Sequence, residues 1–151
     1  MLTVKAKYAL RAMLDLAVAE AGRPVFIADI ARRQDIPRRF LENILIELKK
    51  SGLVVSHRGK HGGYALARAP EAISFAEIIR ISDGPLALAP CASKTAYRRC
   101  DDCRDEATCA VRRVLLEVRE ATAAILERTS LAQAAEAPLD ALINGTSQSP
   151  L

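Results

Sequence analysis

Apolar side chains return every three or four positions through the first third of the chain, the period of helices with one buried face. This pattern predicts a helix over residues 4–21, which Gly22 ends. A short helix over residues 27–33 follows, and a second, over residues 37–50, begins at a proline. The predicted buried face of this second helix consists of Phe40, Leu41, Ile44, Leu45 and Leu48.

The pattern changes from helical spacing to alternation after Gly52. Residues 53–56 and 64–68 predict two short strands, and residues 57–63 between them are polar, basic and rich in glycine. Two short helices separated by a tight turn are typical of a helix-turn-helix, although a helical hairpin in a bundle would show the same pattern. With the β-hairpin as a wing, the predicted fold is mainly α: a winged helix-turn-helix followed by a long C-terminal helix.

The second half of the chain predicts a helix over residues 74–82 and a long helix over residues 106–128. The long helix carries an apolar seam with alternating spacings of three and four residues, formed by Val111, Val114, Val118, Ala121 and Ile125. So broad an apolar stripe must be buried. A second copy of the chain is the expected partner, and packing against the winged domain of the same chain is the alternative. Residues 136–151 are expected to be disordered.

The charge of the chain is unevenly distributed. Residues 1–69 hold 13 lysines and arginines against 6 acidic residues, net +7, whereas residues 70–151 hold 9 against 12, net −3. A basic first half suggests a module that binds a polyanion. Aromatic residues make up 4% of the chain and tryptophan is absent, which argues against a single-strand binder that stacks bases. No apolar run approaches about 18 residues, so we expect no membrane span.

All four cysteines, Cys91, Cys100, Cys103 and Cys109, lie within one short polar segment. Thiolates are soft ligands that suit iron–sulfur clusters and zinc, and their spacing does not separate the two. Disulfides would need an oxidising compartment. The N-terminal sequence lacks an apolar run followed by a cleavage site, so we expect a cytoplasmic protein.

A thiol oxidoreductase that uses Cys100-Asp-Asp-Cys103 is the enzymatic alternative. Such motifs open a helix in a βαβ fold, and no βαβ pattern is present in this sequence. The two aspartates between the cysteines would also raise the thiol pKa and so lower the reactivity of the thiols. We therefore expect no enzymatic activity.

Four segments together with the cysteine spacing carry a family resemblance. They are K-Y-A-L-R-A-M-L-D-L-A at Lys7–Ala17, I-P-R-R-F-L-E-N-I-L at Ile36–Leu45, the wing at Gly52–Arg68, and T-S-L-A at Thr129–Ala132. The chain resembles the bacterial winged-helix iron–sulfur regulators that include IscR, NsrR and RirA. The resemblance implies a homodimer built on the long helix. It also implies a recognition helix in the major groove of double-stranded DNA, wings at the minor groove, and a dyad-symmetric operator.

The resemblance further implies an iron–sulfur cluster, [2Fe–2S] or [4Fe–4S], held by three cysteines and a variable fourth ligand. Cys91 and Cys109 match the first and third family cysteines, and either cysteine between them matches the second. Relatives supply a histidine or a carboxylate at the positions of Arg112 and Lys7, neither of which is an ordinary ligand. We therefore expect all four cysteines to bind one cluster, with Cys100 as the extra ligand. A zinc-stapled regulator or interaction protein without a redox cluster is the alternative.

The expected DNA contacts come from the second helix and the wing. Arg38 and Arg39 suit guanine, and Glu42 either accepts from cytosine or pairs with one of these arginines. The expected wing contacts are Arg58, Lys60, His61, Gly62 and Gly63.

The predicted organisation has four parts. A winged DNA-binding domain (residues 1–82) precedes a cluster-binding loop (83–109), a dimerisation helix (106–135) and a tail (136–151). We expect a sequence-specific transcription regulator, with repression as the expected sense. Its affinity for DNA would be switched by a cluster that senses iron, redox state or nitric oxide.

Overall fold

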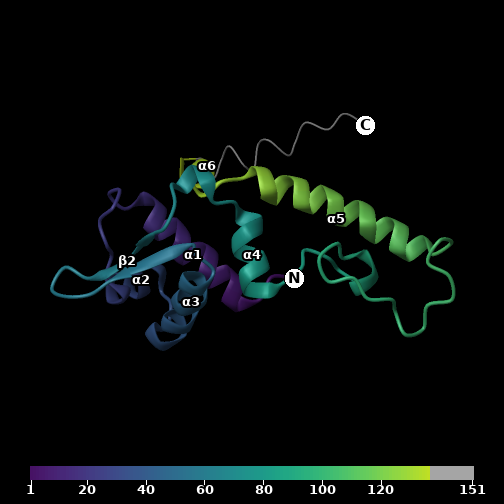
Figure 1. Ribbon diagram of the computed structural model, residues 1–151, viewed down its shortest axis with the longest axis horizontal. Helices are drawn as coiled ribbons and strands as arrows, with labels where there is room; N and C mark the ends of the chain where they lie inside the picture. Colours follow the sequence, from purple (N-terminus) through teal and green to yellow (C-terminus); the bar gives the residue numbers. More distant parts are fainter. Residues whose placement is uncertain (137–151) are drawn as a thin grey trace.

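The computed structural model describes residues 1–136, and the tail expected beyond residue 136 lies outside this range. The described chain is mainly helical with one two-stranded antiparallel sheet, so the predicted fold class is confirmed (Figure 1). Its elements are α1 (Val4–Val18), α2 (Ile27–Gln34), α3 (Arg38–Lys50), β1 (Val54–His57), β2 (Gly63–Leu66), η1 (Pro70–Ala72), α4 (Phe75–Asp83), η2 (Pro90–Ala92), α5 (Ala110–Arg128) and α6 (Leu131–Glu136). None of the described helices has the length and apolarity that crossing a membrane requires.

Helix α1 is the centre of the winged-helix body, and α2, α3, α4 and α6 all pack against it or its neighbours. Its inward positions are filled by small or flexible side chains, including Ala9, Ala12 and Met13, none of which has any exposed surface. Small side chains let the surrounding helices approach closely, which is how one helix can serve several partners. The core built around α1 positions the two elements expected to contact DNA, α3 and the hairpin.

The turn between α2 and α3 has the geometry that a helix-turn-helix requires. Helix α2 ends at Asp35, whose φ of 52° is left-handed, and its backbone N–H donates to the carbonyl of Ala31. Asp tolerates this conformation better than most residues. Pro37 then starts α3 in a new direction, with its missing N–H at a position that needs no intrahelical partner.

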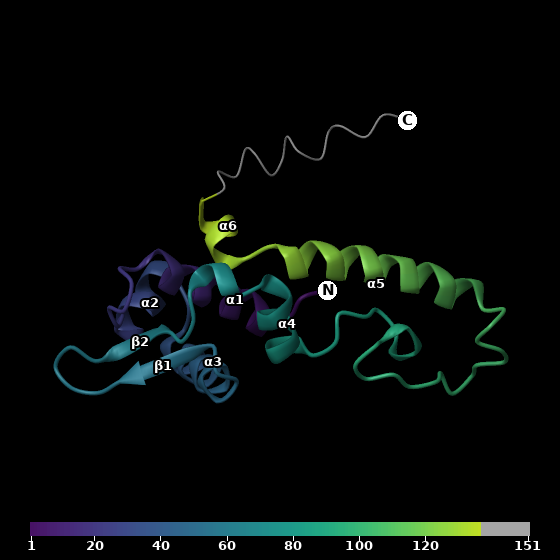
Figure 2. The same cartoon turned by 45° about the horizontal axis from the view of Figure 1, so that its top comes forward.

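The β-hairpin forms the predicted wing. Strands β1 and β2 pair in register from Val54 opposite Leu66 to His57 opposite Gly63, and Tyr64 also pairs with Val25 from the loop before α2. Figure 2 shows the hairpin projecting beyond the helices of the body.

Two helices are shorter at one end than their apolar patterns predict. Helix α1 ends at Val18 because Ala19 adopts an extended conformation and the chain turns at Gly22, whose φ is 76°. Helix α5 begins at Ala110, four residues after the predicted start. The Asp105 carboxylate accepts bonds from the Ala107 backbone and the Thr108 hydroxyl, and these bonds hold the preceding residues in a turn.

Phe40 was predicted to lie on the buried face of α3, and this prediction is wrong. The side chain is 40% exposed, and its ring meets the ring of Tyr8 edge to face with 5.7 Å between centroids. Phe40 sits in the first turn of α3, at the border of the apolar stripe, where α1 covers one side of the ring only.

The segment expected as the dimerisation helix, residues 106–135, is interrupted after the predicted helix end at residue 128 by a pairing that the sequence did not predict. Helix α5 ends at Arg128, and Ser130 pairs with Ser74 before α6 begins. Backbone bonds flank this bridge, from Phe75 N–H to Thr129 O (3.0 Å) and from Leu131 N–H to Ile73 O (2.9 Å). Leu131 is fully buried in the core of the body. The C-terminal end of α5 is therefore anchored to the winged-helix body.

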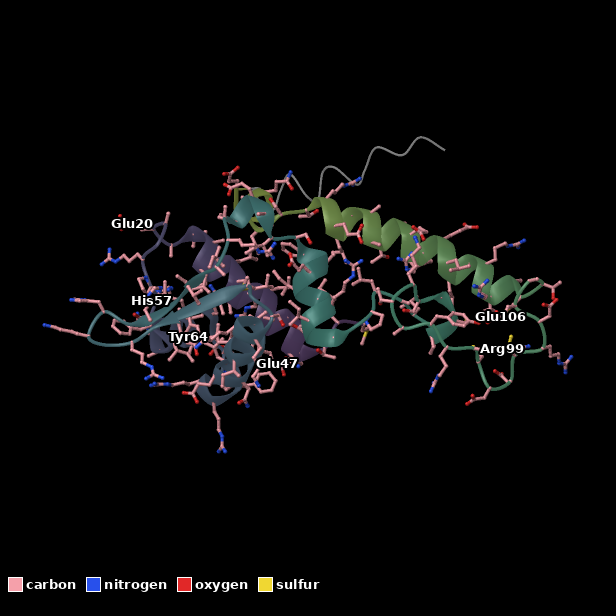
Figure 3. The ribbon with its side chains drawn as sticks, viewed as in Figure 1. Glu20, Glu47, His57, Tyr64, Arg99 and Glu106 are labelled. Carbon is pink, nitrogen blue, oxygen red and sulfur yellow. The ribbon has the colours of Figure 1, made fainter. Side chains whose placement is uncertain are left out.

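Helix α5 and the cysteine-containing loop form an arm that extends from the body (Figure 1). The loop lies at the end of the long axis opposite the tip of the wing. In Figure 3, Arg99 and Glu106 of the loop mark one end, while His57 and Tyr64 of the hairpin mark the other. Within a single chain, the cysteines and the wing are therefore connected through α5, α4 and the body.

Candidate metal centre and nucleic-acid interface

The four cysteines come together at the N-terminal end of α5. All four line one pocket of about 480 Å³, which also includes Asp102, Asp105, Thr108 and Arg112. Cys91 lies on η2 and is buried, whereas the other three thiols are half-buried, and none forms a disulfide. Four thiols at a single pocket give it the donor chemistry of a soft metal centre.

Two of these cysteines are fixed by secondary structure. Cys109 is the N-cap of α5, and its Sγ accepts a hydrogen bond from the Arg112 backbone N–H at 3.4 Å. The Arg112 side chain returns to η2, where its Nε donates to the Cys91 carbonyl at 3.1 Å. Cys91 and Cys109 are thereby held at one corner, although they are far apart in sequence.

Cys100 and Cys103 lie on the polar loop between η2 and α5. The Cys103 backbone N–H donates to the Cys100 carbonyl at 3.1 Å, which closes a tight turn around the two residues. Arg99 donates to the carbonyls of Cys103 and Arg104 at 3.2 and 3.3 Å. This loop contributes no fully buried apolar side chain, so hydrogen bonds rather than packing set its shape.

Electrostatics in the loop depend on close polar neighbours. The pKa of Cys100 is raised, first by its hydrogen bond with the Cys91 thiol and then by burial and the nearby charge of Asp102. The pKa of Tyr97 is also raised, mainly because its hydroxyl donates to Glu106. A bound cation would reverse this balance at the thiols, since metal coordination deprotonates them.

Zinc and an iron–sulfur cluster are the two groups that the four thiols could bind. Within residues 1–136, no three His, Cys, Asp or Glu side chains surround a point closely enough to hold a single metal ion. Tetrahedral zinc bound by thiolates needs sulfur atoms about 3.8 Å apart, given Zn–S bonds of about 2.3 Å. Iron–sulfur clusters are also held by four thiolates. The four thiols that line this pocket therefore offer a donor set that both zinc and an iron–sulfur cluster accept.

The expected base-contacting residues lie on the exposed side of α3. Arg38 and Arg39 occupy its first turn, and both are exposed. Arg38 Nε lies 3.3 Å from Glu42 Oε1, so this arginine and Glu42 form an ion pair in the free chain. An exposed pair of this kind contributes little to stability, and its members are free to exchange partners for DNA.

Arg58, Lys60 and His61 are exposed at the tip of the wing. The two glycines that follow have a role within the fold. A Cβ on Gly62 would lie 2.5 Å from the His57 carbonyl oxygen, and Gly63 has a φ of 138° with the Val25 carbonyl against the position that a Cβ would take. Gly62 is also buried. Both positions need glycine to close the hairpin and to let it dock beside Val25.

A buried ionic network that sequence reasoning missed supports the helix-turn-helix. Asp15 on α1 is buried, and its carboxylate accepts two bonds from Arg33, at 3.0 and 2.6 Å, and one from Gln34 at 3.0 Å. Burial alone would raise the pKa of Asp15, but these bonds outweigh it and hold the pKa below its ordinary value. The available signal was an acidic residue among the apolar positions of the first predicted helix.

The predicted seam of α5 is exposed in the single chain. Val111, Val114, Val118 and Ile125 are between 40% and 68% exposed, and Ala121 is exposed as well. The side of α5 that packs on its own chain is a different one, and it includes Arg119 and Ala123. The seam is therefore a continuous apolar face that nothing in the described chain covers.

A helix-turn-helix with a basic exposed helix and a wing defines a winged-helix transcriptional regulator. Residues 2–137 match the model of the Rrf2 family, which is described as a family of iron-dependent transcriptional regulators. The chain belongs to the Rrf2 family, which confirms the resemblance. Members of this family are DNA-binding transcriptional regulators rather than enzymes, so the oxidoreductase alternative is set aside.

Individual relatives agree with this assignment. An rrf2-like HTH-type transcriptional regulator from Rhodobacter capsulatus is 49% identical over 121 residues, covering 78% of this chain and 81% of the relative. The regulator IscR of Erwinia tasmaniensis is 39% identical over 102 residues, which is 68% of this chain and 62% of the relative.

Two solved structures share the fold but differ in the regulator that each represents. CymR, the global cysteine regulator of B. subtilis, superposes with a TM-score of 0.75 at 30% identity, covering 89% of this chain and 95% of CymR. IscR of T. potens gives a TM-score of 0.70 at 28% identity, covering all of this chain and 93% of IscR. The fold alone does not identify the signal, so the signal has to be inferred from the chemistry of the cysteine pocket.

Proposed function

We propose that the protein is a homodimeric, DNA-binding repressor whose affinity for its operator is switched by an iron–sulfur cluster. The observation that carries the proposal is the convergence of Cys91, Cys100, Cys103 and Cys109 on one pocket at the start of α5. These four thiols would hold the cluster. When bound, the cluster supplies iron–sulfur bonds that iron shortage, oxidation or nitric oxide can break.

The exposed seam of α5 supports a dimer. Its apolar positions recur at spacings of three and four residues, as in helices that pack along one another. A symmetric dimer built on this seam would present two α3 helices and two wings, and would read an operator with matching two-fold symmetry.

Recognition of DNA is assigned to two elements. On α3, Arg38 and Arg39 would contact guanine edges in the major groove, with Glu42 released from its ion pair to meet cytosine. At the wing, Arg58, Lys60 and His61 would contact the minor groove or the phosphates.

The switch follows from how the arm is attached. Cys91 and Cys109 belong to the corner at the start of α5, while Cys100 and Cys103 lie on the loop. A cluster bridging corner and loop would fix the loop against α5. Its loss would release the loop and change how α5 meets its partner. A ligand that favours one of two arrangements in this way satisfies the physical requirement for a switch.

The first test is anaerobic purification with an absorption spectrum and iron, sulfide and zinc analysis. Cys91→Ser and Cys109→Ser should abolish the cluster, and Cys100→Ser should leave one that is more labile or spectroscopically altered. Thr108→Ser, at a pocket position without a soft ligand, is the matched control. Zinc without sulfide in the wild-type protein would favour the zinc-stapled alternative. A normal cluster in Cys100→Ser that is lost in Cys103→Ser would leave three cysteine ligands.

The second test concerns the wing. Replacing both Arg58 and His61 with Ala should weaken operator binding in mobility-shift assays. The slope of log affinity against log salt should fall by about one unit for each phosphate that the variant no longer neutralises. Arg113→Ala removes a positive charge from the first turn of α5, outside the wing, and serves as the control. Equal affinities of the wing variant and the control would remove the wing from the mechanism.

A further inference from the structure

We propose that Arg112 is the positioning residue of the cysteine pocket. It holds Cys91 and Cys109 at a fixed corner, so that the site consists of two preset thiols and two that arrive on the loop. This inference deepens the function proposed above and rests on it only where the cluster itself is concerned.

Arg112 contacts both preset cysteines with different parts of one residue. Its backbone N–H donates to Cys109 Sγ at 3.4 Å, and its side-chain Nε donates to the Cys91 carbonyl at 3.1 Å. The first contact is the N-cap bond of α5, and the second spans 21 positions in sequence. The two contacts connect η2 directly to the first turn of α5.

Packing of η2 makes this connection effective. Ala92 and Ser93 next to Cys91 are buried, and the Ser93 hydroxyl accepts the Ala96 backbone N–H at 3.0 Å. Cys91 itself is only 7% exposed. The turn that carries Cys91 is thus seated against α5, and the Arg112 side chain lies along the wall of the pocket between them.

The other two thiols have no comparable support. Cys100 and Cys103 are joined to each other by a backbone bond and to Arg99 by a carbonyl contact. Apart from the Cys91 thiol beside Cys100, these partners belong to the same loop. Nothing in the described chain ties them to α5 as Arg112 ties Cys91. A site organised in this way would bind its metal group first at the corner and then close the loop over it.

The guanidinium group is suited to this role. Its planar, always charged fork donates in a fixed direction, whereas a lysine ammonium is a flexible point charge. Arg112→Lys therefore keeps the charge and removes the directed donor. Arg113, next to it on α5, is exposed and does not line the pocket, so Arg113→Ala removes the same charge without touching Cys91.

The primary test uses the metal-free, reduced protein. Iodoacetamide labelling followed by mass spectrometry gives a separate rate for each cysteine. Arg112→Ala should speed the labelling of Cys91 by about tenfold, because the variant lacks the hydrogen bond from a charged donor that seats the turn of Cys91. Cys103 should change little, and Arg113→Ala should leave every rate as in the wild type. Arg112→Lys should behave like Arg112→Ala.

Faster labelling of Cys91 alone indicates the loss of a positioning contact, whereas general unfolding would accelerate the labelling of every cysteine. Equal acceleration at all four cysteines, or an unchanged rate at Cys91, would overturn the proposal. A second readout is the rate at which a chelator removes iron from the anaerobically reconstituted protein, expected to rise about tenfold in Arg112→Ala for the same reason. If the wild-type chain takes up no cluster, the function proposed above fails, while the labelling of Cys91 still decides the role of Arg112.

Discussion

The winged-helix body and the arm differ in how complete they are within one chain. The hydrophobic core is built from buried side chains between Ala9 and Ile79 together with Leu131. In contrast, the 19 residues of α5 bury only Arg119 and Ala123, and the pocket at its start is bounded by polar loop. The body has a complete hydrophobic core, whereas the arm presents an exposed apolar seam and a pocket lined by four thiols.

The difference is consistent with the division of tasks in the proposed function. Recognition of DNA needs a rigid surface, which a packed core provides. Response to a signal needs an element with two arrangements of similar free energy, and few buried contacts permit that. Four predictions test this division, in order of expected size.

Dimerisation should be the property most sensitive to change in the arm. Val118→Glu places a charge in the seam, and burying it without a partner costs several kcal/mol, roughly 2–7 for a polar group and more for an ion. Sedimentation should then show monomers. Ala124→Glu adds the same charge on the polar side of α5 and should leave the dimer intact. A dimer that survives Val118→Glu would mean that the seam is not the interface.

Stability of the body should depend on the anchor at the end of the arm. Leu131→Ala removes a fully buried side chain and should lower the free energy of unfolding by about 3 kcal/mol. Urea denaturation measures the loss. Ala132→Gly, next to it in α6 and only partly buried, should cost about 1 kcal/mol. An equal loss in the two variants would show that the anchor does not pack as described.

The Asp15 network should give the body a dependence on pH. Asp15→Asn should lower the free energy of unfolding by about 2 kcal/mol at pH 7, since hydrogen bonds to a charged group are weakened. The folded pKa of Asp15 is lowered from 3.8, so its stabilisation is present above that value and is lost as the pH falls below it. Urea curves of wild type and variant should therefore converge in acid. A constant difference across pH would contradict the ionic role.

The smallest effect is expected where arm and body meet at the surface. Arg80 on α4 and Glu127 on α5 form an exposed ion pair at 2.5 Å. Glu127→Gln should change the free energy of unfolding by less than about 1 kcal/mol, and salt should diminish the effect. Thermal melts at low and high salt measure it. A large effect would mean that this pair, rather than Leu131, holds the arm to the body.

Much of the fold was predictable from local pattern. The periodicity of α1, α3 and α5 and the glycine-rich hairpin are strong signals, because each follows from burial on one face or from a turn that needs glycine. The start of α5 and the exposure of Phe40 were not predictable. The first depends on side-chain bonds of Asp105, and the second on how far α1 covers the first turn of α3.

The candidate site was predictable in composition but not in arrangement. Clustered cysteines predict a metal centre, yet their spacing does not show that two are fixed by secondary structure and two belong to a loop. The bond from Arg112 to Cys91 joins residues 21 positions apart, so only the folded chain reveals it. The link between Ser130 and Ser74 was missed for the same reason, since a pairing of single residues leaves no periodic signal.

The attachment of α5 at Ser130 and Leu131 has a geometric consequence. A helix of 19 residues is about 28 Å long, at about 1.5 Å per residue. Because its far end is fixed, a tilt of about 5° at the anchor displaces the cysteine end by roughly 2.4 Å over that length. Conversely, a displacement of a few ångströms at the pocket would reach the body as a rotation of only a few degrees. In the proposed switch, the length of α5 would thus convert a large displacement at the loop into a small rotation of the surfaces expected to meet DNA.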